Sequence, residues 1–366
     1  MFIRIASVAV LALSLAVVEP QSGVKARAIL EAHLSHGIGR SPFDSDVWRD
    51  ETNAAIIVKA RSGVTRGELE AVTASREELD SRLALLRQRG FVRFDGSLIR
   101  AAFPIVIEEA HGRYMRLISE AASRVYAEMR GAWQRLLADL DARGWADWSY
   151  HFVWSQTMDS GFTWAPMMEQ GRVPPLSSVI VWVVQPAHPF KSGTNYYPDT
   201  ELRDQMLAVT WRPRTAATVG RVGRAWPSIW SAAVTGESTV AERQELRGLG
   251  LVDNDGRIRV PVVRKQDALY ARLEALGSDH VRLVARHLML PQLRELTGDD
   301  EKVTFAMGYH DVSWEILKRM VDEGMLAVPP ALREGAARDV PMVGVCALID
   351  SHPSIQRELR KALGIK

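Results

Sequence analysis

One series of landmarks occurs twice along this chain of 366 residues, in the same order each time. Each series holds an Asp-Gly pair, a Tyr-x-Arg-Leu segment, a Tyr-His pair, a Val-Pro-Pro segment and a His-Pro pair. They lie at 95–96, 114–117, 150–151, 173–175 and 188–189, and again at 255–256, 270–273, 309–310, 328–330 and 352–353. Ordered self-similarity of this kind indicates a repeated structural unit. We therefore predict a tandem duplication, with one copy at about 29–212 and the other at 213–366.

Each copy begins with a pattern of helices followed by a hairpin. Residues 65–72 and 75–89 have helical patterns, and Ser75 can cap the second helix in a capping box with Glu78. Asp95-Gly96 then separates two short apolar segments, which is a hairpin signal because both residues tolerate positive φ. This order resembles the winged helix-turn-helix superfamily over about 54–104, and more loosely over about 222–264. The resemblance identifies no individual family.

The remainder of each copy alternates helical and strand patterns. We expect a long helix at 114–140 with a counterpart at 279–296 that is interrupted at Pro291. Apolar runs at 179–184 and 343–349 predict strands, and Gly193-Thr194-Asn195 predicts a turn. The expected fold class is mixed α/β (α+β), with helices packed on a short sheet in each copy.

The N-terminus predicts export. After Arg4, residues 5–18 carry no charge, and Glu19-Pro20 ends the run. A transmembrane helix needs about 20 residues, so this shorter run fits the apolar region of a signal peptide better. We predict a signal peptide over about 1–28, a periplasmic or secreted protein, and no other transmembrane span. The alternatives are an uncleaved membrane anchor, or a cytoplasmic protein whose start codon is wrongly assigned.

The charge pattern disfavours nucleic acid as a partner. The 46 basic and 44 acidic side chains nearly cancel, so there is no global field to attract an anionic polymer. The first candidate recognition helix begins with Glu77, Glu78 and Asp80, where approach to base edges would favour neutral or basic residues. Arginines in the expected wings could still reach phosphates, so a DNA-binding regulator stays open as an alternative. These arginines are Arg93, Arg100, Arg257 and Arg259.

The repeated Tyr-His pairs are the best candidates for catalysis. On a helix, His151 and Ser155 share a face and Asp159 follows one turn later, an arrangement that can orient a general base or a metal ligand. The second copy has no carboxylate at a matching distance from His310. We therefore name His151, His310 and Asp159 as catalytic candidates, with packed, hydrogen-bonded histidines as the alternative.

Tryptophans and the His-Pro histidines are the candidates for ligand binding, because an indole ring offers a large contact area and one donor. The residues are Trp148, Trp154, Trp164, Trp314, His188 and His352. Four histidines meeting across a pseudo-twofold axis could surround a metal ion, but their spacing assigns no metal site. Nor does any motif assign a cofactor. The single cysteine, Cys346, lies in an apolar run and is expected to be buried in a strand.

The sequence thus favours an exported two-repeat binding or interaction protein. It would recognise a small molecule or a protein at a junction rich in Trp and His. The alternatives are a histidine-dependent enzyme that uses His151 or His310, with or without a metal, and the winged-helix regulator. The sequence specifies neither the ligand, nor a reaction, nor the oligomeric state.

Overall fold

The computed structural model describes residues 21–31, 33–36, 46–175, 178, 180–198, 205–298 and 300–363. It is a mixed helix-and-strand protein, so the expected α+β class is confirmed. Most of the predicted signal peptide, residues 1–20, lies outside the described residues. No helix in the described part of the chain is both long and apolar enough to span a membrane.

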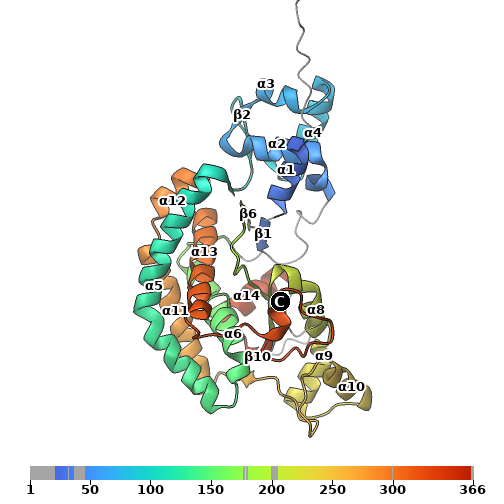
Figure 1. The fold of residues 1–366 in the computed structure, drawn as a ribbon, viewed down its shortest axis with the longest axis vertical. Coiled ribbons are helices and arrows are strands. Elements are labelled where there is room, and N and C mark those ends of the chain that lie inside the picture. The colour runs from blue at the N-terminus through green and yellow to red at the C-terminus, as the bar shows by residue number, and fades with distance from the viewer. Residues whose placement is uncertain are drawn as a thin grey trace, which may run out of the picture. The chain divides into compact units, whose positions relative to one another are not determined.

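The chain forms two compact units. The first comprises residues 1–31 with 45–102, and the second comprises 32–44 with 103–366, as far as these residues are described. The first unit contains α1 (Gln21–Leu30), α2 (Glu51–Lys59), β2 (Val64–Thr65), α3 (Arg66–Leu69), α4 (Arg76–Gln88), β3 (Val92–Asp95) and β4 (Leu98–Ala101) (Figure 1). Its strands form a sheet in the order β2-β4-β3.

The local signals of the first unit hold in the structure. Ser75 accepts a hydrogen bond from the backbone N–H of Glu78, while the Glu78 carboxylate accepts from the backbone of Ala74. The carboxylate thus bonds one residue before the cap, where a full capping box would have it reach Ser75 itself. Gly96 turns the β3–β4 hairpin with a φ of 60°, as the Asp95-Gly96 pair predicts. The apolar stripe of α4 is buried.

The second unit holds the remaining elements. Its helices are α5 (Glu108–Ala142), α6 (Ser149–His151), α7 (Gly161–Glu169), α8 (Ala216–Arg224), α9 (Trp226–Trp230), α10 (Val240–Gly248), α11 (Ala268–His287), α12 (Leu290–Thr297), α13 (Glu301–Asp322) and α14 (Pro353–Leu363). Its strands are β1 (His33–His36), β5 (Ile105–Val106), β6 (Ile180–Val184), β7 (Gly193–Pro198), β8 (Gln205–Trp211), β9 (Val262–Val263) and β10 (Cys346–Asp350). A π-helical segment, η6 (Phe152–Gln156), continues α6.

Two sheets of this unit share one topology. One has the order β1-β6-β5, and the other contains β8-β10-β9 with β7 added at its edge. In the first sheet, the central strand β6 runs antiparallel to β1 and parallel to β5, which lies between β1 and β6 in the sequence. In the second sheet, the central strand β10 likewise runs antiparallel to β8 and parallel to β9, which lies between β8 and β10. The predicted strand at 179–184 corresponds to β6, and the one at 343–349 starts three residues late, as β10.

The structure corrects two local predictions. Gly193-Thr194-Asn195 belongs to β7 and makes no turn, because Gly193 pairs with Trp211 across the β7–β8 ladder. The predicted helix at 279–296 is two helices that begin earlier: α11 starts after the capping Asp267, and α12 has Pro291 in its first turn. The break near Pro291 was therefore placed correctly, but the start was not.

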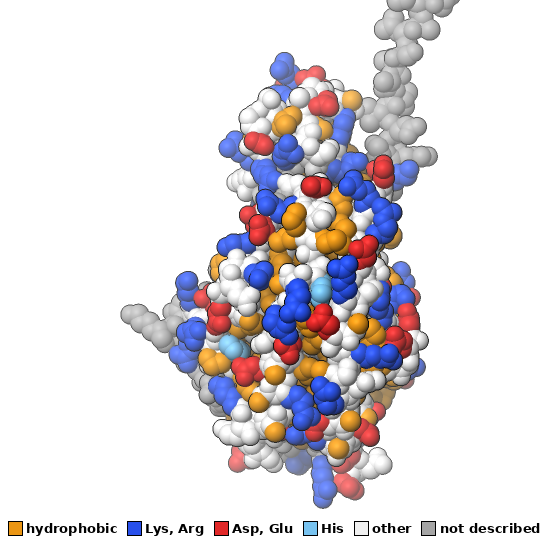
Figure 2. Space-filling model, turned by 90° about the vertical axis from the view of Figure 1, so that its left-hand side faces the viewer, with side chains coloured by type: hydrophobic (Ala, Val, Ile, Leu, Met, Phe, Trp, Pro, Cys, Tyr) orange, Lys and Arg blue, Asp and Glu red, His pale blue; other side chains and the backbone are white. Residues whose placement is uncertain are grey.

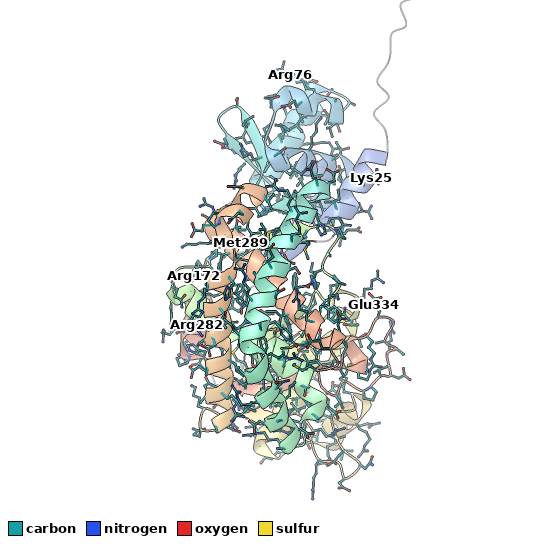
Figure 3. All side chains as sticks on the ribbon, turned by 60° about the vertical axis from the view of Figure 1, so that its left-hand side comes forward. Lys25, Arg76, Arg172, Arg282, Met289 and Glu334 are labelled. Atoms are coloured by element: carbon teal, nitrogen blue, oxygen red, sulfur yellow. The ribbon has the colours of Figure 1, made fainter. Side chains whose placement is uncertain are left out.

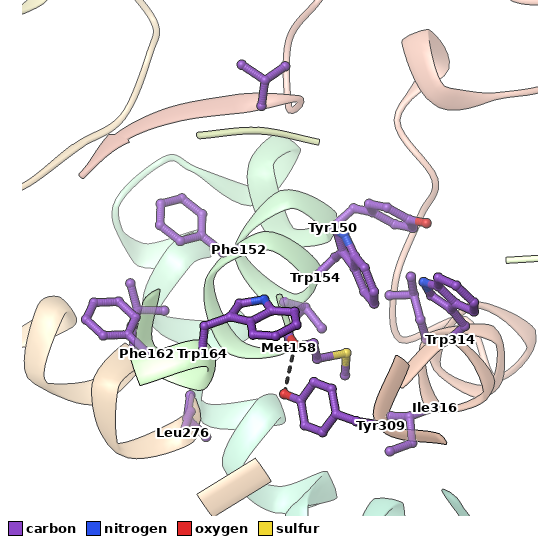
Figure 4. Close-up of a cluster of buried hydrophobic side chains, with 14 of the residues drawn as sticks. Tyr150, Phe152, Trp154, Met158, Phe162, Trp164, Leu276, Tyr309, Trp314 and Ile316 are labelled. Carbon is purple, nitrogen blue, oxygen red and sulfur yellow. Dashed lines mark hydrogen bonds between the residues drawn. The ribbon is translucent and has the colours of Figure 1, made fainter. Parts of the chain in front are cut away.

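The core of the second unit is built by packing between elements of the two predicted copies. The long helix α5 packs on α11 and α13, and α7 of the first predicted copy packs on α11 of the second. The Tyr-His segment of the second predicted copy also contacts a sheet strand of the first, since α13 lies on β6. The segment of the first copy, η6, lies on β8, which pairs with β10 of the second copy. Figure 4 shows aromatic side chains from both Tyr-His segments meeting in this core, where the Tyr309 hydroxyl donates to the carbonyl oxygen of Met158 at 2.8 Å.

Candidate functional site

The tryptophans selected from the sequence are core residues. Trp148, Trp154, Trp164 and Trp314 are each at most 3% exposed. Trp148 donates to the carbonyl oxygen of Cys346 at 2.9 Å, and Trp314 donates to that of Ser192 at 2.9 Å. They therefore fill and connect the interior (Figure 4) and do not present their rings to a cleft. Cys346 is buried in β10, as expected, and burial raises the pKa of its thiol to about 12.

His310 and Asp159 meet in this core. His310 Nδ1 lies 2.8 Å from the carbonyl oxygen of Ala306, and its Nε2 lies 3.7 Å from Asp159 Oδ1. Trp164 donates to the same carboxylate oxygen at 3.1 Å. The His310 ring is also packed against the rings of Trp164, Trp182 and Trp314. The structure thus brings together four of the residues selected from the sequence.

His151 belongs to a separate group. Its Nδ1 lies 2.8 Å from Thr210 Oγ1, which also lies 2.5 Å from Ser155 Oγ, so His151 and Ser155 do share a face. Its Nε2 lies 3.2 Å from the amide nitrogen of Gln156. Complete burial lowers the pKa of His151 to about 3, which keeps the ring neutral. Asp159 lies beyond the π-helical segment, and its carboxylate is near His310 instead.

The two His-Pro histidines are also engaged. His188 accepts from the backbone N–H of Phe190 at its Nδ1 and lies 3.2 Å from Glu315 Oε2 at its Nε2. His352 accepts from the backbone N–H of Ser354 at its Nδ1, and its Nε2 lies 3.5 Å from Glu274. The four histidines therefore have four different sets of partners. No group of three potential metal ligands occurs among the described residues, which gives the four-imidazole hypothesis no support.

Two acidic residues of α13, Asp311 and Glu315, were not selected from the sequence but have buried or half-buried polar partners. Asp311 Oδ2 accepts from the Tyr114 hydroxyl at 2.5 Å, and burial raises the pKa of Asp311. The bond from His188 holds the pKa of Glu315 below its usual value. The buried Lys191 lies near this group, and burial lowers its pKa to about 8. The available signal was the i,i+4 spacing of Asp311 and Glu315, which places both on one helix face.

An open cleft lies elsewhere in the second unit, between the β7–β8 hairpin and α8. Its volume is about 260 Å³. The lining residues are Asn195, Tyr197, Val209, Trp211, Ala216, Val219 and Gly220. The hairpin supplies the aromatic rings and α8 supplies small side chains. The lining residues come from both sides of residue 212, which is the boundary predicted between the two copies.

Glycines position the two rings of the cleft. A Cβ added at Gly193 would lie 2.2 Å from the indole of Trp211, its cross-strand partner, so this ring lies directly against the Gly193 backbone. A Cβ at Gly223 on α8 would lie 2.3 Å from the ring of Tyr197. Neither ring could keep its position if a side chain replaced the glycine. Ala216 and Gly220 leave open the space that larger helix residues would fill.

The opposite face of the same hairpin connects to the buried histidines. Thr194 donates to Ser155 at 2.9 Å, and Tyr196 donates to the backbone oxygens of Ser155 and Asp159. Residues of β7 that alternate with these, Asn195 and Tyr197, line the cleft. The buried polar network therefore holds the cleft hairpin in place, with His151 bonded to Thr210 on β8.

Comparisons with known proteins add no relative: no protein-family model, no curated protein and no solved structure matches this chain.

Proposed function

We propose that this protein is a two-repeat binding protein that takes a small molecule into the cleft between β7–β8 and α8. The observation that carries the proposal is the cleft itself, where two aromatic rings face a stripe of small residues. Its volume of about 260 Å³ is slightly below the range of about 300–1,000 Å³ for ligand pockets. A cleft of this size suits a small compound of one or two rings.

Histidine-dependent catalysis has less support. A general base needs a ring nitrogen that a substrate can reach. Both nitrogens of His151 and His188 have partners, and both nitrogens of His310 face protein atoms. Since all three rings are buried, a substrate would have to displace core contacts to meet them.

Nucleic-acid binding has less support for an electrostatic reason. In the first unit, four arginines already pair with carboxylates, which reduces their value as phosphate ligands. The pairs are Arg66–Asp80, Arg76–Glu70, Arg82 with Asp50 and Glu78, and Arg100–Asp95. Arg76 is labelled in Figure 3. On the face drawn in Figure 2, basic and acidic side chains are interspersed.

Tandem duplication is part of the proposal. The shared sheet topology and the meeting of the two Tyr-His segments in one core support it. Winged-helix-like modules are also proposed: the first by the order α2, β2, α3, α4 and a β3–β4 hairpin, the second by α8, α9, α10 and a bridge between Val252 and Ile258. A module of this kind can serve as a packing element, so it does not imply DNA binding.

Export remains a further part of the proposal. It rests on the uncharged run at residues 5–18. The test is to express the full chain with a C-terminal tag, fractionate the cells and sequence the mature N-terminus. We expect a processed protein outside the cytoplasm. An unprocessed cytoplasmic protein would contradict export and leave the cleft proposal unaffected.

The binding proposal is tested by filling the cleft. Gly220 has space for a side chain, because only the Arg224 guanidinium lies within 4 Å of its Cβ position. We expect Gly220→Leu to fold at least as stably, since glycine costs about 1 kcal/mol in a helix interior. A panel of one-ring and two-ring compounds is then screened by thermal shift. We expect some to stabilise the wild type and not Gly220→Leu.

The matched control is Gly131→Leu, which also replaces a helical glycine but lies exposed on α5. This variant should keep every ligand response of the wild type. A response that survives in Gly220→Leu would place binding outside the cleft. If no compound shifts the wild type at millimolar concentration, the small-molecule proposal is wrong.

A further inference from the structure

We propose that the ligand is an acid, with a flat ring inside the cleft and an anionic group on Arg224 at its edge. This inference rests on the proposed function and names the chemical class of the ligand. Two independent features carry it: the absence of charge in the lining of the cleft, and an arginine beside it that has no carboxylate partner among the described residues.

The lining selects an uncharged ring. Its hydrogen-bonding side chains are those of Asn195, Tyr197 and Trp211, and none of the lining residues is an acid or a strong base. Asn195 donates to the Tyr197 hydroxyl at 3.3 Å, which leaves its amide oxygen available. A charged group deep in the cleft would lose hydration without gaining a counter-ion. The ring is therefore expected to carry its charge at the edge.

Arginines flank the α8 part of the lining in the sequence. The segment that enters and forms α8 contains Arg212, Arg214, Arg221 and Arg224. Three of these have partners within the described residues. Arg212 donates to the carbonyl oxygens of Pro189 and Leu332, Arg221 donates to that of Arg338, and Arg214 lies 3.7 Å from Glu334, which is labelled in Figure 3.

Arg224 is different from these three. One of its guanidinium nitrogens, Nη1, lies 3.8 Å from the Cβ position of Gly220, and Gly220 lines the cleft. Across the described segments of the chain, no carboxylate lies within 4 Å of the Arg224 guanidinium. A guanidinium in this position can hold a carboxylate or phosphate through two parallel hydrogen bonds. Arg224 is thus placed to bind an anionic group of a ligand whose ring occupies the cleft.

The test compares ligands that differ only in charge. Indole-3-acetate, indole-3-acetamide and tryptamine share a ring and differ in the charged group, and benzoate, benzamide and benzylamine form a one-ring series. Each is titrated calorimetrically into the full chain at low and high salt. We expect the acid of at least one series to bind about fivefold more tightly than its amide at low salt, with the difference reduced at high salt. The amine should bind most weakly.

Arg224→Gln should bring the affinity for the acid down to that for the amide. Arg214→Gln is the matched control, because it removes a second arginine of the same segment that is already paired with Glu334. The thermal stability of both variants is measured first, since Arg224 also lies in the last turn of α8.

Two results would overturn the inference while leaving the cleft proposal standing. One is an amide or amine that binds at least as tightly as its acid, provided that Gly220→Leu abolishes that binding. The other is a preference for the acid that survives in Arg224→Gln. Absence of binding by all six compounds and by the wider ring panel would instead overturn the proposed function, and this inference with it.

Discussion

The carboxylate of Asp159 and the imidazole of His310 lie 3.7 Å apart in the core of the second unit. Asp159 follows η6 in the first predicted copy, and His310 lies in the middle of α13 in the second. Since both residues are nearly buried, their interaction is only weakly screened by solvent. The pair therefore contributes to holding the two predicted copies together.

We expect Asp159 and His310 to be energetically coupled. Asp159→Asn and His310→Gln should each destabilise the protein, and the double variant should lose less than the sum, by a coupling of about 1 kcal/mol. Urea unfolding of the wild type and the three variants measures this. Asp141→Asn, on the exposed end of α5, is the control and should be additive with His310→Gln. If the effects of Asp159→Asn and His310→Gln on the free energy of unfolding are additive, the two side chains are neighbours without interaction.

Lowering the pH should destabilise the protein already in the range where the histidines of an unfolded chain become protonated. Burial lowers the pKa of His151 and of His280 to about 3, whereas an unfolded histidine titrates near about 6.5. Below about pH 6.5 the unfolded chain binds protons at both positions while the folded chain does not. The stability that these two neutral histidines contribute should therefore be complete above about pH 6.5 and fall by roughly 1.4 kcal/mol per pH unit for each histidine as the pH decreases toward about 3.

Urea midpoints at pH 7, 6 and 5 test this dependence. His280→Gln should reduce the slope measurably, because it removes one of the two fully buried neutral imidazoles, whose Nε2 lies 2.8 Å from Ser313 Oγ. His111→Gln, at a partly exposed position on α5, should leave the slope unchanged. A slope that is the same in wild type and His280→Gln would show that other groups control the acid response.

Local features were predictable because they depend on neighbours in the sequence. The cap at Ser75 and the turn at Gly96 follow from short-range hydrogen bonding and from φ preferences, and both occur. Gly193 was misassigned to a turn because its extended conformation depends on pairing with Trp211, which no local pattern reveals. Glycine permits several backbone conformations, and the sequence alone does not show which of them the tertiary contacts select.

The candidate site shows the same limit. The sequence correctly selected residues that meet, such as His310 with Trp164 and Trp314. Burial was not predictable, because a tryptophan that fills a core and one that lines a cleft have the same local signature. The cleft residues Tyr197 and Gly220 went unnoticed because a cavity depends on what is missing between two elements, here a larger side chain on α8.

Separate halves of the chain should not fold independently. In the structure, α13 packs on β6, α11 packs on α7 and β10 pairs with β8, so each half lacks surfaces that the other provides. We expect fragments 21–212 and 213–366 to be insoluble or poorly structured alone, and to form a soluble complex when co-expressed. Co-purification through a tag on one fragment, with circular dichroism of each, measures this. Independent, cooperative melting of either fragment would show that its fold does not depend on these contacts.

The position of any N-terminal processing should affect stability. In the first unit α1 packs on α2, with Ala26 and Leu30 almost fully buried and Gly23 close to the backbone of Glu51. A chain that begins at Gln21 retains this helix, whereas a chain that begins after Ala28 loses it and exposes apolar surface on α2. We expect the shorter chain to be less stable by about 2 kcal/mol or more, as for two buried side chains. Thermal melts of the two chains measure this difference.

Two substitutions in the longer chain serve as controls. Replacing Leu30 with alanine should reproduce part of the loss in stability. Lys25→Ala should have little effect, because the Lys25 side chain, labelled in Figure 3, is exposed. Equal stability of the two chains would show that α1 contributes nothing to the folded unit, and a processing site after Ala28 would then carry no cost.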